Sequence, residues 1–279
     1  MSLTIASINS GSNGNCYYIG NEDEGVFVDA GISCRETEKR MKRLDLPIEK
    51  INAIFVSHEH GDHITGVPAL SKKYQIPVYI TSPTFSNSRI PVESHLIHSF
   101  EAHQPVQIGT LSITPFPKFH DAADPHSFII QSKQISVGVF TDIGVPCQHL
   151  IRYFQQCQAA FLEANYDSEM LEKGNYPYHL KKRISGGEGH LSNHQALELF
   201  LSHRPPFMSH LLLAHLSKNN NHPKLVADLF APHAGSTEII VASRYQESAK
   251  FLITDQPHQT VPQIIREKKN KPVQLNLFG

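Results

Sequence analysis

Short apolar runs that end directly in a histidine, aspartate or glutamate recur along this chain, and they restrict its fold more than any other feature. Three of these runs lead to His58, Asp142 and His215. Apolar runs of this kind, with helix-like segments between them, are typical of buried strands in an α/β fold. Ligands of such sheets bind beyond the strand ends, so the pattern predicts one site assembled from distant parts of the sequence.

Periodicity predicts where the individual elements lie. We expect strands at 3–8, 15–19, 25–29, 51–57, 77–81, 110–116, 135–140, 158–162, 210–214 and 238–243. Helical spacing indicates helices at 35–44, 65–74 and 193–202. No linker or repeat interrupts these elements, which predicts one folded domain at residues 1–254 followed by a polar tail at 255–279.

The composition suits a packed globular protein and gives no general affinity for polyanions. The chain is 40% hydrophobic and its net charge is −1, so nucleic acid would have to bind through local patches or metals. The first residues lack the pattern of a signal peptide, no stretch is long enough for a membrane span, and the cysteines form no CxxC pair. We therefore expect a cytoplasmic protein with reduced thiols.

Histidine is unusually abundant, with 18 residues, and part of it forms a compact HxHxDH motif. The motif consists of His58, His60, Asp62 and His63. The first two imidazoles project from one side of an extended turn and can share one metal, while the Asp-His pair turns toward a second metal. Nitrogen and carboxylate ligands without thiolate favour zinc, with manganese or iron as alternatives.

Four groups cannot saturate two metals, so further ligands must come from later strand ends. The candidates are His120, Asp142 and His215, each of which follows an apolar strand. His103 and His126 are weaker alternatives to His120, because neither follows a strand so directly. Each candidate alone could be an ordinary buried or surface residue, but together with the HxHxDH motif they complete two metal sites.

At these residues the sequence resembles the metallo-β-lactamase superfamily, over about residues 3–245. The resemblance implies an α/β fold, a four-layer αβ/βα sandwich with the metals at one edge. It assigns the first metal to His58, His60 and His120, the second to Asp62, His63 and His215, and a bridging position to Asp142. It also implies that Asp29 braces the metal-binding loop, although a strand-end turn would explain this aspartate equally well.

Finer motifs resemble the YycJ/WalJ-type branch of this superfamily. They lie at residues 10–15, 119–121, 162–167, 189–193 and 215–220. The true β-lactamases that use two zinc ions mostly have cysteine where this chain has Asp142. The branch implies a 5′→3′ exonuclease that acts on DNA in repair or replication. The segment from Asp142 to His215 is too short for the β-CASP cap domain of larger nucleases, and His126 stands where a small apolar residue is expected.

The resemblance implies a hydrolysis in which two metals hold a bridging hydroxide that attacks phosphorus in line, with Asp62 among the catalytic residues. The leaving oxygen then needs a proton. His190 with Glu163 is the candidate donor pair, because similar residues accompany the metal motif in transfer-RNA 3′-processing endonucleases. A carboxylate beside an imidazole keeps the imidazole protonated and oriented. The alternatives are a surface carboxylate for Glu163 and a helix-capping loop residue for His190.

Several polar residues are candidate substrate contacts. A glycine-rich turn could offer backbone N–H groups to a phosphate, although a plain hairpin turn is an equal explanation. Its polar residues are Ser10, Ser12, Asn13 and Asn15. Asn219 could hydrogen-bond a nucleotide or belong to an ordinary asparagine-rich loop. The basic runs at 72–73 and 181–183 could follow a DNA backbone, but such runs are more often solvated faces.

Other functions share part of this pattern. A hydrolase of a small phosphodiester, such as a cyclic nucleotide, would use the same ligands, and only the DNA enzyme would show steeply salt-dependent DNA binding. A transfer-RNA 3′ endonuclease is disfavoured because the chain has no flexible Gly/Pro-rich arm. A di-iron redox protein normally needs an electron-carrier domain, and a non-enzymatic scaffold would not need every ligand.

The polar tail contains an apolar motif that resembles the sliding-clamp-binding peptide of bacterial DNA enzymes. Its residues are Gln274, Leu275, Leu277 and Phe278. Such peptides place a few apolar anchors in a preformed groove while the glutamine hydrogen-bonds the rim. The motif therefore predicts a clamp as partner, and packing of these side chains on the protein's own surface is the alternative.

Overall fold

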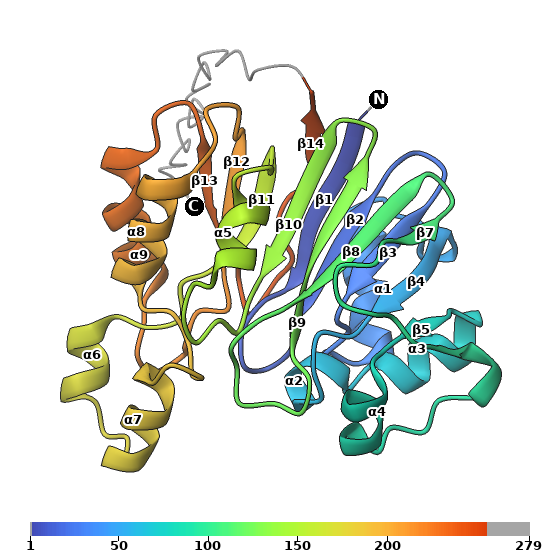
Figure 1. Ribbon diagram of the computed structural model, residues 1–279, viewed down its shortest axis with the longest axis horizontal. Coiled ribbons are helices and arrows are strands. Elements are labelled where there is room, and N and C mark those ends of the chain that lie inside the picture. Colours follow the sequence, from blue (N-terminus) through green and yellow to red (C-terminus); the bar gives the residue numbers. More distant parts are fainter. Residues whose placement is uncertain (1, 256–279) are drawn as a thin grey trace, which may run out of the picture.

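Two seven-stranded β-sheets face each other in the computed structural model, which describes residues 2–255 (Figure 1). The first sheet has the order β14 (Phe251–Thr254), β1 (Ser2–Asn9), β2 (Cys16–Gly20), β3 (Gly25–Val28), β4 (Ile51–Phe55), β5 (Val78–Tyr79) and β6 (Ile97–His98). The second sheet has the order β13 (Glu238–Val241), β12 (His210–Ala214), β11 (Ala159–Glu163), β10 (Ile135–Phe140), β9 (His126–Ser132), β8 (Leu111–Pro117) and β7 (Val106–Ile108).

Helices cover the outer face of each sheet, which confirms the four-layer αβ/βα sandwich (Figure 1). The first sheet is covered by α1 (Cys34–Arg43) and α3 (Val67–Tyr74), and the second by α5 (Gln148–Phe154), α8 (Asn193–His203) and α9 (Pro223–Phe230). Near the lower edge in Figure 1 lie α2 (Gly61–Ile64), α4 (Ser82–Ser88), α6 (Ser168–Lys173) and α7 (Tyr178–Ser185). Single 3₁₀ turns occur at Ile48–Lys50, Ser94–Leu96 and Ala231–His233. Residues 143–214 contain only the helices α5 to α8 and the strands β11 and β12. No β-CASP cap domain is therefore inserted there.

The strands are apolar along most of their length because both faces of each sheet are covered. In β4, Ala53 and Phe55 point into the core between the sheets, whereas Ile54 packs against the helices. In β10, Val139 lies in the same central core and Phe140 faces the outer helices of the second sheet. A strand covered on both sides excludes polar residues from most positions, which accounts for the continuous apolar runs in the sequence.

The strands that precede the candidate ligands run in the same direction within each sheet. Strands β10 to β13 are parallel to one another, and β8 has the same direction as β10 because both are antiparallel to β9. In the first sheet, β3, β4 and β5 are parallel. Their carboxyl ends therefore meet along one edge of the sandwich, near α2 in Figure 1.

All the expected strands occur, and none of their ends is shifted by more than two residues. The strands β6, β7, β9 and β14 and the helices α2, α4 to α7 and α9 were not predicted from the sequence. The expected helix at 65–74 begins only at Val67. A Cβ on Gly66 would lie 2.0 Å from the carbonyl oxygen of Ile32, so the chain at Gly66 is pressed against another loop and does not continue the turn of α2.

The tail predictions fall outside the described residues, which end at residue 255. They concern Gln274, Leu275, Leu277 and Phe278. The division into a domain at 1–254 and a tail stays a prediction, and β14 joins residues 251–254 to β1 in an antiparallel pair. No helix within residues 2–255 is both long and apolar enough to cross a membrane.

We predict that Gly31→Ala destabilises the protein, because an added Cβ would lie 1.7 Å from the carbonyl oxygen of Asp62 and 2.7 Å from the backbone nitrogen of Asn15. Two backbone segments cannot both move away, so the loss in unfolding free energy should be about 2 kcal/mol or more. Gly61→Ala is the matched control, since its Cβ would meet only Thr65 Oγ1 at 4.0 Å. Urea denaturation of both variants with a chelator present measures the difference, and equal midpoints would contradict this account.

Candidate metal centre

The structure brings all seven predicted ligands together at the shared strand edge, although they come from four separate segments of the chain. His58 and His60 follow β4, and α2 carries the next two ligands. The remaining ligands each follow a strand of the second sheet: His120 after β8, Asp142 after β10 and His215 after β12. In three overlapping groups, the ligand atoms lie within 4.8 Å of one another: His58, His60 and His120; Asp62, His63 and His215; and His58, His63 and Asp142.

Three imidazoles form one side of the cluster. Nδ1 of His60 lies 3.1 Å from Nε2 of His58 and 3.3 Å from Nε2 of His120. A neutral imidazole has a lone pair at only one nitrogen. Three ring nitrogens at this spacing are therefore better arranged to bind one cation than to hydrogen-bond one another. The group has the nitrogen donors and the number of side chains that a zinc-type site uses.

A carboxylate-rich group forms the other side, and Asp142 lies between the two sides. Asp62 Oδ2 lies 3.4 Å from His215 Nε2 and 3.5 Å from His63 Nε2. Asp142 Oδ2 lies 3.2 Å from His63 Nε2, and Asp142 Oδ1 lies 3.9 Å from His120 Nε2 on the imidazole side. Oδ2 of this buried carboxylate accepts no well-aligned hydrogen bond within residues 2–255, as expected for an atom whose partner is a metal ion.

In three of the candidate ligand imidazoles, the ring nitrogen Nδ1 is hydrogen-bonded outside the cluster. These contacts fix which nitrogen of each ring faces the cluster. His63 Nδ1 donates to Asp29 Oδ2 at 2.7 Å, and His120 Nδ1 donates to the carbonyl oxygen of Gly189 at 3.0 Å. His215 Nδ1 lies 3.0 Å from Glu163 Oε1. Metal-binding histidines usually donate their second N–H to a carboxylate or carbonyl in this way. The contacts leave Nε2 of each ring as the available ligand.

Asp29 braces the loop that begins with the HxHxDH motif. Its Oδ1 accepts from the backbone nitrogen of Ser57 and its Oδ2 from the Ser57 hydroxyl, each at 2.8 Å. The same hydroxyl lies 2.9 Å from His58 Nδ1. One fully buried carboxylate therefore orients two imidazoles, His63 directly and His58 through Ser57.

The electrostatics differ between the two sides. Burial lowers the pKa of His58 well below its usual value and that of His120 to about 4, so both rings are neutral and able to bind a metal. Burial also acts to lower the pKa of His63 and His215. The negative charge of nearby carboxylates, Asp142 above all, has a larger and opposite effect on both pKa values. The carboxylates raise the pKa of His63 well above its usual value and that of His215 to about 10. This buried negative charge attracts cations, so the residues present fit divalent metal ions.

Glu163 and His190 lie at the margin of the cluster. His190 Nδ1 is 2.7 Å from Glu163 Oε1, and the same oxygen contacts His215. Oε2 of Glu163 accepts from the backbone nitrogens of Ile143 and Leu191. Burial acts to raise the pKa of Glu163, but His190 and His215 lower it to about 2. Glu163 is fully buried, whereas the His190 side chain is 16% exposed, so His190 alone of this pair can reach a substrate.

The predicted substrate-contact residues have mostly internal partners. Ser10 Oγ accepts from the backbone nitrogen of His215 at 2.7 Å, and Asn15 Nδ2 donates to Asp62 Oδ2 at 3.1 Å, so both brace ligands. Backbone nitrogens of residues 10, 11, 14 and 15 already have internal acceptors, which argues against the turn as a phosphate-binding nest. The side chains of Ser12 and Asn13 contact Arg244, and Asn219 donates to the Tyr176 hydroxyl at 3.0 Å.

The two alternative histidines lie outside the ligand groups. His103 is exposed and lies 3.2 Å from the Tyr153 hydroxyl. His126 is buried at the start of β9, where its ring packs edge-on against Phe100 at 5.2 Å. The departure at position 126 is therefore accommodated by a ring contact in the core.

Sequence reasoning missed three residues that support the site. Ser57 and Lys118 are buried close to the ligands, and Lys118 Nζ donates to the carbonyl oxygen of Thr141 at 2.7 Å, next to Asp142. Asn165 Nδ2 donates to the carbonyl oxygen of His215 at 2.8 Å. Each lies one or two residues from a predicted site residue at a strand end. That adjacency was the available signal, but it does not show which way a side chain points.

Comparisons with known proteins identify the family. Residues 25–215 match the model of the β-lactamase superfamily domain. The chain is 33% identical to the exodeoxyribonuclease YycJ of Bacillus anthracis over 230 residues, covering 81% of this chain and 86% of that protein. It is 32% identical to the exodeoxyribonuclease WalJ of Streptococcus pneumoniae over 217 residues, covering 76% and 81% respectively. The crystal structure of the metallo-β-lactamase fold protein YhfI from Bacillus subtilis superimposes with a TM-score of 0.69 at 17% identity, over 90% of this chain and all of that one.

The chain belongs to the metallo-β-lactamase superfamily, within its YycJ/WalJ-type branch. The structural likeness to YhfI shows the shared fold. Family membership together with the histidine and carboxylate cluster identifies a metal-dependent hydrolase that uses divalent ions.

We predict that Asp29→Asn weakens metal binding about 10- to 100-fold, because the amide cannot accept from Ser57 and His63 as the carboxylate does. Asparagine tolerates the positive φ of 60° at this position, so the fold should survive. Competition with a chromophoric chelator measures the affinity. Asp124→Asn, at a half-buried carboxylate outside the ligand groups, should bind metal like the wild type. Equal affinities for the two variants would remove Asp29 from this role.

Proposed function

We propose that this metallo-β-lactamase-superfamily hydrolase cleaves phosphodiester bonds of DNA from a 5′ end, acting in DNA repair or replication in the cytoplasm. Similarity over most of the chain to two proteins named exodeoxyribonucleases supports DNA as the substrate. The single structural observation that carries the proposal is the buried seven-ligand cluster with the partly exposed His190 at its margin. Four free cysteines within residues 2–255 agree with a reducing compartment.

We propose two ions, with zinc as the first candidate. The imidazole group and the carboxylate-rich group each offer three side chains. The carboxylate of Asp142 lies near both groups. Imidazole and carboxylate without thiolate favour zinc, while manganese and iron also accept such mixed ligands. When bound, the ions lower the pKa of water and offset negative charge on a phosphate group undergoing attack.

The chain's own residues supply orientation and a proton. Asp29, Glu163 and the carbonyl of Gly189 hold the ligand rings from behind, so the cluster is rigid before substrate arrives. Glu163 remains ionised at neutral pH and accepts from Nδ1 of His190, whose side chain is partly exposed. In this geometry, His190 donates the proton that the leaving oxygen of the scissile ester requires. Glu163 acts through His190 and is a positioning residue.

The other candidate functions are separated by substrate. A small-phosphodiester hydrolase would use the same ligands, and a transfer-RNA 3′ endonuclease would act on RNA. The length of the matches to the two exodeoxyribonucleases favours DNA over both. Turnover of an end-labelled duplex compared with a cyclic nucleotide and a transfer-RNA precursor distinguishes the three. Turnover of only the cyclic nucleotide or only the RNA would replace the DNA proposal.

We predict that His190→Ala keeps its metals and slows DNA cleavage about 10²- to 10⁴-fold, the usual effect of removing a general acid. The defect should shrink on a nitrophenyl phosphodiester, because nitrophenolate leaves without a proton. Single-turnover rates on both substrates, together with metal analysis, test this. His194→Ala, at an exposed histidine of α8 four residues further along, is the control and should cleave DNA normally. Equal defects of His190→Ala on both substrates would contradict proton donation.

We also propose that the tail binds a bacterial sliding clamp through residues 274–278. The support is the sequence motif and the polar stretch that precedes it. The isolated peptide 270–279 should bind the clamp, and a peptide with Leu277→Ala and Phe278→Ala should bind at least tenfold more weakly, because the apolar anchors are lost. Fluorescence anisotropy measures both affinities. Equal affinities would end the proposal.

A further inference from the structure

A hollow of about 420 Å³ lies directly beside the metal centre, between the loops that follow β12 and β13. Ser10 and Leu216 form its boundary with the cluster. Ser10 Oγ accepts the backbone N–H of His215, and Leu216 is the next residue in the chain. The hollow therefore adjoins the loop that carries His215.

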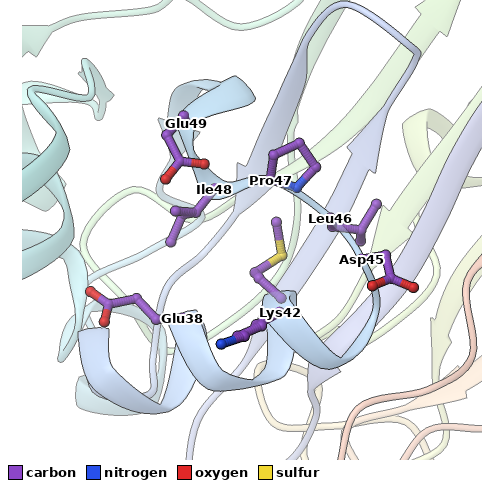
Figure 2. Close-up of a pocket in the computed structure, with 8 residues that line it drawn as sticks. Glu38, Lys42, Asp45, Leu46, Pro47, Ile48 and Glu49 are labelled. Atoms are coloured by element: carbon purple, nitrogen blue, oxygen red, sulfur yellow. The ribbon is translucent and has the colours of Figure 1, made fainter.

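The lining of this hollow selects for negative charge. It includes Lys218, His222 and Arg244 and no carboxylate. Within residues 2–255, neither Lys218 nor Arg244 forms an ion pair. Two other hollows have carboxylates beside their lysines. Glu38, Asp45 and Glu49 accompany Lys42 beside α1 (Figure 2), and Glu172 accompanies Lys181 and Lys182 beside α7. An anion near the metal centre is thus drawn to the loops after β12 and β13.

Arg244 is held in place before any ligand binds. Its Nη2 donates to Ser12 Oγ at 2.9 Å and lies 3.3 Å from Asn13 Oδ1, while Asn13 Nδ2 donates to the Arg244 carbonyl oxygen at 2.9 Å. Nη1 of Arg244 donates no hydrogen bond within residues 2–255. These partners are neutral, so no carboxylate offsets the charge of the guanidinium. Ser12 and Asn13 therefore fix the position of a cationic residue that belongs to the lining of the hollow.

The rest of the lining mixes neutral polar and apolar residues and includes an exposed aromatic ring. Leu216, Pro223 and Val241 line the hollow, and Tyr245 beside them is 73% exposed. Exposed aromatic rings next to cationic groups are a common platform for nucleic-acid bases, because the base stacks while the cations hold the phosphate. A phosphorylated terminal nucleotide matches both parts of this lining.

We propose that this hollow binds the terminal 5′-phosphate of a DNA strand and the nucleotide attached to it, an inference that rests on the proposed exonuclease function. Lys218 and Arg244 contact the phosphate, and Tyr245 contacts the base. A terminal phosphate, with a second pKa of about 6, carries more negative charge at neutral pH than a phosphodiester within the strand. The cations therefore distinguish an end from the interior, and they place the first phosphodiester beside the metals.

Binding to matched oligonucleotides tests the proposal. The metal-loaded full chain with His190→Ala, used to slow cleavage, is titrated into duplexes that differ only in a 5′-phosphate, a 3′-phosphate or neither. Fluorescence anisotropy at fixed salt should show about tenfold tighter binding of the 5′-phosphorylated duplex, the effect of one charged hydrogen-bonded contact. Adding Lys218→Ala should reduce that ratio several-fold. Lys224→Ala, at an exposed lysine outside the hollow that pairs with Asp228, should preserve it.

The outcomes separate this inference from the function on which it rests. Equal binding of the 5′-phosphate and 5′-hydroxyl duplexes, an equal gain from a 3′-phosphate, or an unchanged ratio in Lys218→Ala would overturn the phosphate site while leaving DNA hydrolysis intact. Failure to bind any of the duplexes would overturn both proposals. A reduced ratio in Lys218→Ala together with a preserved ratio in Lys224→Ala supports the site.

Discussion

The common direction of the strands that carry the site is the constraint on which the rest of this structure depends. Strands from both sheets end at one edge, and the chain must turn sharply there without covering the site. Asp29, Asp142 and His215 follow β3, β10 and β12, and all three have positive φ, between 55° and 60°. Aspartate and histidine enter this region more readily than most residues. The turns therefore use the same residue types that the metal chemistry needs.

Buried negative charge explains why so much of the surrounding structure is polar. Glu163 shows this most clearly, because one oxygen contacts both His190 and His215 while the other accepts two backbone N–H groups. A buried carboxylate is stable only when its oxygens are satisfied. The same contacts that satisfy Glu163 join the proposed proton donor to a metal ligand, so the two groups keep a fixed separation.

The sequence allowed the fold class and the ligand cluster to be predicted because their signals are local. A buried strand requires an apolar run, and a ligand at its end is read directly from the next residues, as in the run before His58. The prediction of individual elements failed where polar residues or tertiary contacts interrupt the local pattern. Strand β9 was missed because it begins with the polar residues His126 and Ser127. The start of α3 was misplaced because Gly66 contacts a loop more than thirty residues earlier, which separates α3 from α2.

By itself, then, the sequence predicted the candidate ligand types, their strand-end positions and the α/β architecture, because each follows from nearest neighbours along the chain. Only the tertiary structure decided what those residues face. It turned Ser10 and Asn15 toward the ligands His215 and Asp62, and it set Ser12 against Arg244, more than two hundred residues away. Such pairs form because the sheets bring remote loops to one edge, where buried or partly buried polar groups must find partners. No local pattern encodes that choice.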